Sequence, residues 1–183
     1  MKKIILIFVI VSLFSGILKA KKPQVTLPER DGVVIYTEVV EVDGVTKGDL
    51  FARGMEWVAK NYVSANHVVQ FKDKEAGTIV GKANLRVYIK NPIKFNFGVV
   101  KYTVSLYLKD GKYKYEFTDF YHDGTTSEYY GGKSYGPIMN EKTKWSIRKK
   151  QWNTLKWQID EQIKSIITDL KKSMESKKTD DDW

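Results

Sequence analysis

The 183-residue chain contains no cysteine, only two histidines and four prolines. Without cysteine it can form no disulfide, thiol nucleophile or thiolate metal site, and it cannot be a lipoprotein modified on cysteine. His67 and His122 lie far apart in the sequence and match no zinc-binding spacing such as His-Glu-x-x-His. We therefore interpret both as ordinary surface or strand-end histidines, and we expect no metal and no cofactor.

Sequence motifs for phosphate binding and for serine hydrolysis are also lacking. Gly131-Gly132 precedes Lys133-Ser134, but the first glycine of a phosphate-binding loop is missing, and no strand leads into a helix there. No Gly-x-Ser-x-Gly nucleophile elbow occurs.

One long apolar run is present, and it stands at the N-terminus. Lys2 and Lys3 precede the run Ile4–Leu18, which Lys19 and Ala20 follow. This order is typical of a secretory signal peptide, so we predict cleavage near Ala20 and export to the periplasm or the outside. The run has 15 residues, whereas a membrane-spanning helix needs about 20, so a retained anchor is the weaker alternative.

Positive charge is concentrated towards the C-terminus. The net charge of +9 falls to +6 without the leader, and residues 142–178 carry eleven basic against four acidic side chains. Either these are the solvated face of a helix, or they attract an anionic partner such as an acidic glycan, a lipid headgroup or an envelope protein. Nucleic acid is not expected for an exported protein.

Periodicity predicts one domain over residues 32–176. After an extended lead-in at 21–31, the β-branched segment 32–42 is apolar on both faces, which favours a central strand. Thr46 and Asp49 form a capping-box pattern, and the helix that follows has one apolar stripe. The members of that stripe are Phe51, Met55, Val58 and Tyr62, with Trp57 beside it.

Further along, the period changes to two. We predict strands over 68–71, 78–90, 98–108 and 112–121, the last two joined by an Asp110-Gly111 hairpin turn. In the last strand the expected inward set is Tyr113, Tyr115, Phe117, Asp119 and Tyr121. Residues 123–140 have many glycines and tyrosines but no period, so we predict a loop.

The C-terminal part is helical over about 145–176, and a disordered tail is expected at 177–183. The apolar stripe of this helix consists of Trp152, Leu155, Ile159, Ile163, Ile166, Leu170 and Met174. The predicted fold is therefore α+β: a two-layer structure with a five-stranded antiparallel sheet and helices on one face, in the order β-α-β-β-β-β-α.

Three stretches resemble a bacterial envelope family, a domain of unknown function with a TATA-binding-protein-like (TBP-like) fold. They read GVVIYTEVVEVDGVTKGDLFARGMEWVAKNY, SANHVVQFKDKEAGTIVGK and KDGKYKYEFTDFYH, and KKQW at 149–152 adds to them. The resemblance implies this fold and an exported setting. It implies no activity and no catalytic residues, and sharing a fold with a DNA-binding protein does not imply DNA binding.

The sheet face turned away from the helices is the candidate binding surface of a non-enzymatic module. Basic and tyrosine side chains alternate there, and the tyrosine-rich loop is expected at its rim. The candidate binding residues are Lys82, Arg86, Tyr88, Lys101, Tyr107, Lys114, Tyr129, Tyr130 and Tyr135. A solvated face without a ligand would look the same.

Two alternatives stay open. A hydrolase acting on an envelope polymer would need paired carboxylates, and Glu38 and Glu116 are the pair we considered on the open face. An assembly subunit would pair through a second apolar stripe of the C-terminal helix, with Trp145, Ile147, Trp157 and Ile167 as its members. Sequence does not decide the oligomeric state.

Overall fold

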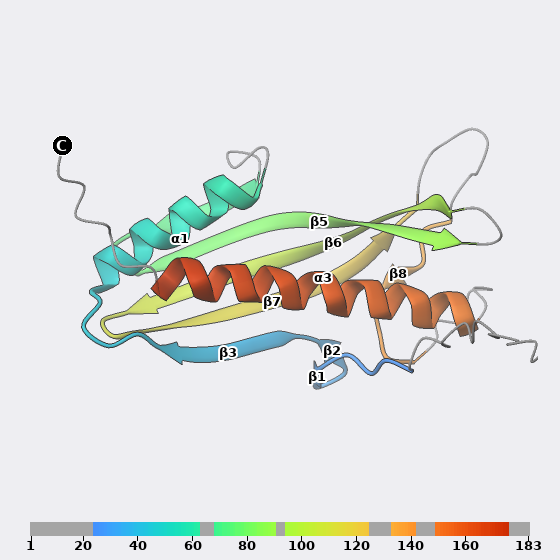
Figure 1. The fold of residues 1–183 in the computed structure, drawn as a ribbon, viewed down its shortest axis with the longest axis horizontal. Helices are drawn as coiled ribbons and strands as arrows, with labels where there is room; N and C mark the ends of the chain where they lie inside the picture. The colour runs from blue at the N-terminus through green and yellow to red at the C-terminus, as the bar shows by residue number, and fades with distance from the viewer. Residues whose placement is uncertain (1–23, 63–67, 91–93, 125–132, 142–148, 176–183) are drawn as a thin grey trace, which may run out of the picture.

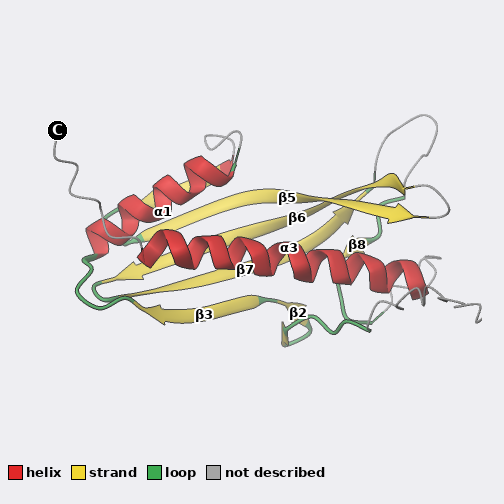
Figure 2. Cartoon of the chain, viewed as in Figure 1, coloured by secondary structure: helices red, strands yellow, loops and turns green. Residues whose placement is uncertain are grey.

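Two helices cover one face of a twisted antiparallel sheet (Figures 1 and 2). The computed structural model describes residues 24–62, 68–90, 94–124, 133–141 and 149–175. The predicted leader, His67, Tyr129, Tyr130, Trp145, Ile147 and the tail lie outside these residues. The α+β class and the two-layer arrangement are confirmed.

The main sheet has six strands in the order β3-β7-β6-β5-β4, with β8 paired to β7. Its strands are β3 (Tyr36–Glu41), β4 (Val69–Asp73), β5 (Thr78–Lys90), β6 (Lys94–Lys109), β7 (Lys112–Asp123) and β8 (Gly136–Pro137). A separate two-stranded sheet pairs β1 (Glu29–Arg30) with β2 (Val33–Val34). Five strands of the main sheet were predicted. The two-residue strands were missed because two residues carry no readable period.

The expected alternation holds along β5 and β6. Their inward side chains are buried: Ile79, Ala83, Leu85, Val87, Val100, Tyr102, Val104, Leu106 and Leu108. Between them, Lys82, Arg86 and Lys101 are exposed on the other face. This pattern is that of a sheet with one face packed on the core and one face solvated.

In β7 the predicted alternation is wrong beyond Phe117. Thr118 pairs with Thr103 and Tyr121 pairs with Lys101, so Asp119 and Phe120 together oppose one residue of β6. This β-bulge places Asp119 in a left-handed conformation with φ of 57° and shifts every later side chain to the other face. Phe120 is therefore buried, whereas Tyr121, predicted to point inward, is 44% exposed.

The first predicted strand is not central. Residues 33–34 pair with β1, and β3 lies at the edge of the main sheet, next to β7 alone. Val39 is consequently 55% exposed. Its β-branched neighbours suggested burial on both faces, but one edge and one face of this strand remain uncovered.

The helices α1 (Lys47–Asn61) and α3 (Lys149–Glu175) begin close to where the sequence predicts. The hydroxyl of Thr46 accepts a hydrogen bond from the Asp49 N–H at 3.1 Å, which confirms the N-cap. The buried residues of α1 are Leu50, Gly54, Trp57 and Val58, so its inward face is rotated from the predicted stripe. The stripe of α3 is buried apart from Ile166, which is partly buried against the core.

The lead-in is hydrogen-bonded both to α3 and to the segment that precedes α3. The Val25 N–H donates to Asn153 Oδ1 at 2.9 Å, and the Leu27 N–H donates to Asn140 Oδ1 at 2.7 Å. Leu27 is only 1% exposed. None of the described helices is long and apolar enough to span a membrane.

Candidate functional site

The candidate surface is the face of the main sheet opposite the two helices. On β5 and β6, Lys82 pairs with Thr103, Asn84 with Lys101 and Arg86 with Val99. Diagonal neighbours on one sheet face lie roughly 7–8 Å apart, so Lys82, Lys101 and Arg86 surround Asn84. The structure thus brings three of the predicted site residues into one basic group.

These three cations differ in how far they are neutralised. Lys101 Nζ lies 2.6 Å from Asp123 Oδ2, and the hydrogen bond from Lys101 lowers the pKa of the Asp123 carboxyl. Lys82 and Arg86 have no ion-pair partner among the described residues. They are therefore the cations of this group that an anionic ligand can reach without displacing a carboxylate.

A second group lies at the β6–β7 turn and contains a hollow. Val39 pairs with Lys114, and Lys114 pairs with Tyr107, so the three form one row across β3, β7 and β6. Lys114 Nζ lies 4.6 Å from the centre of the Tyr107 ring, within cation–π range. A hollow of about 310 Å³ adjoins this row, and its lining residues are Val39, Tyr107, Lys109, Lys112, Tyr113 and Lys114.

Large exposed apolar and aromatic side chains collect on this same face. Of the six that the described residues contain, four point this way: Val39, Phe71, Tyr107 and Tyr121. Of these four, only Tyr107 was predicted from the sequence. Tyr121 was missed because of the bulge, and Val39 because β3 was expected to be buried. Lys109 and Lys112 were missed because they flank the predicted hairpin turn and were not counted among the residues of the open face.

Of the remaining predicted tyrosines, Tyr88 and Tyr135 lie among the described residues, and Tyr135 is not at the expected rim. Tyr88 is half-buried, and its backbone bonds to Gln158 of α3. Tyr135 stacks on Phe97 with ring centres 5.5 Å apart and contacts His122, which faces the core. Tyr135 therefore lies on the helix side and not at the rim of the open face.

The carboxylate pair considered for a hydrolase is not formed. Glu38 pairs with the buried Tyr115 and points towards the helices, whereas Glu116 pairs with Thr37 on the open face. Glu116 forms an ion pair with Lys114 at 3.0 Å. Because the two carboxylates lie on opposite faces of the sheet, they cannot act on one bond as acid and base.

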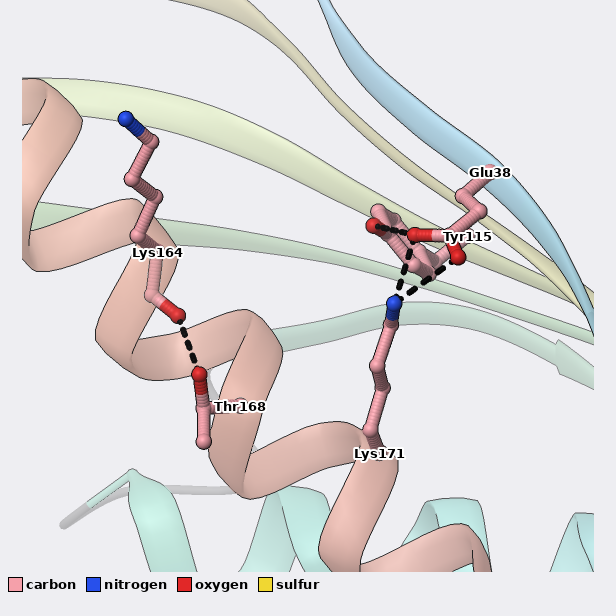
Figure 3. Close-up of polar contacts among 5 residues, drawn as sticks. All are labelled: Glu38, Tyr115, Lys164, Thr168 and Lys171. Atoms are coloured by element: carbon pink, nitrogen blue, oxygen red, sulfur yellow. Dashed lines mark hydrogen bonds and ion pairs between the residues drawn. The ribbon is translucent and has the colours of Figure 1, made fainter.

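Glu38 instead belongs to a polar cluster at the edge of the helix layer (Figure 3). The Lys171 ammonium lies 2.8 and 2.7 Å from its two carboxylate oxygens, and the Tyr115 hydroxyl donates to it at 2.7 Å. One turn earlier on α3, the Thr168 hydroxyl donates to the Lys164 carbonyl at 2.9 Å. Another hollow of about 310 Å³ lies near this cluster, lined in part by Tyr36, Tyr115 and Ile167.

The ionisation of this cluster is that of a structural contact. The hydrogen bond from Lys171 lowers the pKa of the Glu38 carboxyl, and burial raises the pKa of the Tyr115 and Tyr36 hydroxyls. Glu38 stays ionised and both tyrosines stay protonated near neutral pH. A general acid or base would need a pKa moved towards the working pH, and these pKa values move away from it.

His122 is likewise structural. It is fully buried, its Nε2 lies 2.9 Å from the Phe97 carbonyl oxygen, and its Nδ1 accepts the Tyr135 N–H at 3.2 Å. With Nδ1 as acceptor, Nε2 carries the proton and the ring is neutral. Among the described residues, no group of three or more His, Asp or Glu side chains is placed to hold a metal ion.

Comparison with known proteins identifies the domain. Residues 36–123, which form β3 to β7 with α1, match the model of a family described as a domain of unknown function (DUF4468) with TBP-like fold. The chain carries a DUF4468 domain. The resemblance seen in the sequence, over 32–122, is thereby confirmed as to family and fold. No curated protein matches the chain significantly.

Two solved structures share the fold of the DUF4468 domain. A DUF4468 family protein from Bacteroides ovatus aligns with a TM-score of 0.63 at 15% identity, over 84% of this chain and 92% of that one. A TBP-like protein from Parabacteroides distasonis aligns with a TM-score of 0.58 at 19% identity, over 79% and 96%. Both alignments extend well beyond the DUF4468 segment, so the shared architecture covers most of the chain.

Proposed function

We propose that this DUF4468 protein is a non-enzymatic binding module that takes an anionic ligand on the open face of its sheet. One observation carries the proposal: four of the six large exposed apolar and aromatic side chains of the described residues share that face with lysines and an arginine. Such side chains supply contact area, while Lys82, Arg86 and the lysines of the hollow supply charge.

The ligand best matched to this face combines an anionic group with an apolar or sugar-ring surface. In the hollow, the Tyr107 ring and Val39 offer a stacking and packing surface beside Lys109 and Lys112. An acidic glycan and an anionic lipid headgroup both have this chemistry. The hydrolase alternative loses its carboxylate pair, and Ile167 of the assembly alternative packs against the chain's own core.

Export is part of the same proposal. In residues 1–20, basic residues are followed by an apolar run and then by the small residue Ala20, and this order supports removal of a signal peptide near Ala20. N-terminal sequencing of the protein recovered from the periplasm or medium of a bacterial host is expected to begin at Lys21. Recovery of the intact chain from membranes would show a retained anchor instead.

The binding test uses the chain from Lys21 onward, which contains every described residue. Its affinity for polygalacturonate and for phosphatidylglycerol vesicles is measured at two salt concentrations. We expect Lys82→Glu/Arg86→Glu and Lys109→Glu/Lys114→Glu each to weaken binding of the better probe about tenfold, ~1.4 kcal/mol. Lys150→Glu, an exposed change on α3, is the matched control and is expected to change little.

The two probes separate the two sources of anionic chemistry, because only one of them contains lipid. Equal loss of binding in the Lys150→Glu control would show that binding depends only on the net charge of the protein, and it would contradict the open-face site. Binding of neither probe by the unaltered protein would also contradict it.

A further inference from the structure

The free edge of β3 has a feature that the binding proposal does not use. Among the described residues, the only strand paired with β3 is β7, which leaves its other edge open. An open strand edge presents unpaired N–H and C=O groups, which is a template for another strand.

Two hydrogen bonds fix the direction of these groups. The Val42 N–H donates to the Gly111 carbonyl at 2.7 Å, towards β7, and the Ile35 N–H donates to the Pro28 carbonyl at 3.0 Å, away from it. Backbone direction alternates along a strand, so Thr37, Val39 and Glu41 point their N–H and C=O outward, as Ile35 does. None of these outward groups has a partner among the described residues.

Another exposed strand edge of the sheet is handled differently. Beyond the end of β4, the Tyr88 N–H donates to Gln158 Oε1 at 3.0 Å, and Gln158 Nε2 donates to the Tyr88 carbonyl at 2.7 Å. Gln162 Nε2 donates to the Arg86 carbonyl at 3.3 Å. Helix α3 thus satisfies the edge of β5, and β4 is interrupted by a bulge near Phe71. In the part of the chain that the structure describes, no side chain bonds to the outward backbone groups of residues 37–41 in this way.

The outward-pointing residues Thr37, Val39 and Glu41 can pair with the same residues of a second copy of the chain. In an antiparallel pair about a two-fold axis at Val39, Val39 faces Val39 of the second copy, and Thr37 faces Glu41. Each of these pairs is a hydrogen-bonded one, so all outward N–H and C=O groups of both strands find partners. The two Val39 side chains lie next to each other on the open face, and no like charges face each other. Moving the axis to Glu38 would oppose two carboxylates, which is unfavourable.

We propose that the occupant of this edge is a second copy of the chain, joined through β3 in the register centred on Val39. The two main sheets then continue across the two-fold axis, and their open faces lie side by side. Three residues per strand form a small contact, so the dimer is a weak one that depends on concentration.

Crosslinking tests the register directly, because the chain has no native cysteine. Paired Cα atoms in a hydrogen-bonded antiparallel pair lie about 5.5 Å apart, within disulfide reach. Val39→Cys in the chain from Lys21 onward is expected to form a disulfide dimer on mild oxidation. Thr37→Cys alone is the matched control and is expected to stay monomeric, since its two copies lie about 13 Å apart along the strands.

A mixture of Thr37→Cys and Glu41→Cys proteins is expected to crosslink to each other. Without oxidation, sedimentation equilibrium of the unaltered chain is expected to show reversible dimers at high micromolar concentration. Val39→Pro removes one outward N–H at a position where a strand edge tolerates proline, and Val39→Lys places two charges together. Each is expected to leave a folded monomer, as judged by circular dichroism.

A monomer at every concentration, or a dimer crosslinked equally well through Thr37→Cys alone, would overturn the proposal. It is separable from the binding function, because Lys82→Glu/Arg86→Glu lies on β5, away from β3. That variant is expected to bind the better probe about tenfold more weakly and to keep the dimer.

Discussion

His122 is the residue whose ionisation most directly concerns the fold. Burial lowers the pKa of its imidazole from the ordinary value of 6.5. Both ring nitrogens are in use, and protonation of Nδ1 would remove the acceptor for the Tyr135 N–H. The neutral ring therefore fits its site, and the charged ring does not.

Stability is expected to fall as the pH drops below about 6.5. In that range the unfolded chain takes up a proton at His122 that the folded chain resists, so the stabilisation is fully present above pH 6.5 and declines towards the lower folded pKa. One proton gives a slope of up to about 1.4 kcal/mol per pH unit. Urea midpoints at pH 7.5, 6.5 and 5.5 measure this decline.

His122→Gln is the comparison for this prediction. It is expected to be less stable at pH 7.5, since one side-chain amide cannot replace both ring contacts, yet to lose less stability between pH 7.5 and 5.5. The carboxylates with lowered pKa, Glu38, Glu56 and Asp123, titrate below this window. An unchanged pH slope in the variant would assign the effect to another group.

At the scale of elements, side chains of α3 form the hydrogen bonds that a neighbouring strand would otherwise form with the edge of β5. Gln158 forms two hydrogen bonds with the backbone of Tyr88, and Gln162 forms one with Arg86. A helix side chain thus satisfies a strand edge that β4 is too short to reach.

Gln158→Leu is expected to cost about 1–3 kcal/mol, because it removes both hydrogen bonds between the Gln158 amide and the Tyr88 backbone. Hydrogen exchange of the Tyr88 amide is expected to speed up with it. Glu161→Leu, exposed on the same helix, is the matched control and is expected to leave that amide unchanged. Equal exchange rates in the two variants would show that the glutamine contact contributes nothing.

Elements with a clean period were predictable, and the exceptions have local causes. The α3 stripe and the alternation of β5 and β6 follow from burial of one face, which the order of residues records directly. The bulge at Asp119 was not predictable, because one extra residue shifts the phase without changing composition. The edge position of β3 depends on pairing with β7, a partner far away in sequence, and no local pattern encodes it.

The candidate surface was predicted in part for the same reasons. Lys82, Arg86 and Lys101 were found because they lie in regularly alternating strands. The hollow beside Tyr107 was not, because it needs three strands in register. Tyr135 was misplaced because the segment before β8 has no period from which a face could be read.

At the scale of the whole molecule, the lead-in belongs to the folded domain. Leu27 is 1% exposed, and its backbone bonds to Asn140. Leu27→Ala is expected to lower the free energy of unfolding by about 2–5 kcal/mol, as for other buried leucines. Val33→Ala, at a position 50% exposed, is the control and is expected to stay within ~0.5 kcal/mol.

Urea denaturation of both variants measures the difference. Equal midpoints for Leu27→Ala and the unaltered chain would show that the lead-in is dispensable, and that the domain begins at β1.

The contacts of the lead-in and of β3 also set the order in which the chain can fold during synthesis. The Val25 N–H bonds to Asn153 of α3, and Tyr36 pairs with Phe117 of β7, so neither contact can form until more than half of the chain has been made. Pairings this distant form late and slowly. The export that we propose requires an unfolded chain, and contacts that form this late keep the domain from completing its fold while it is being made.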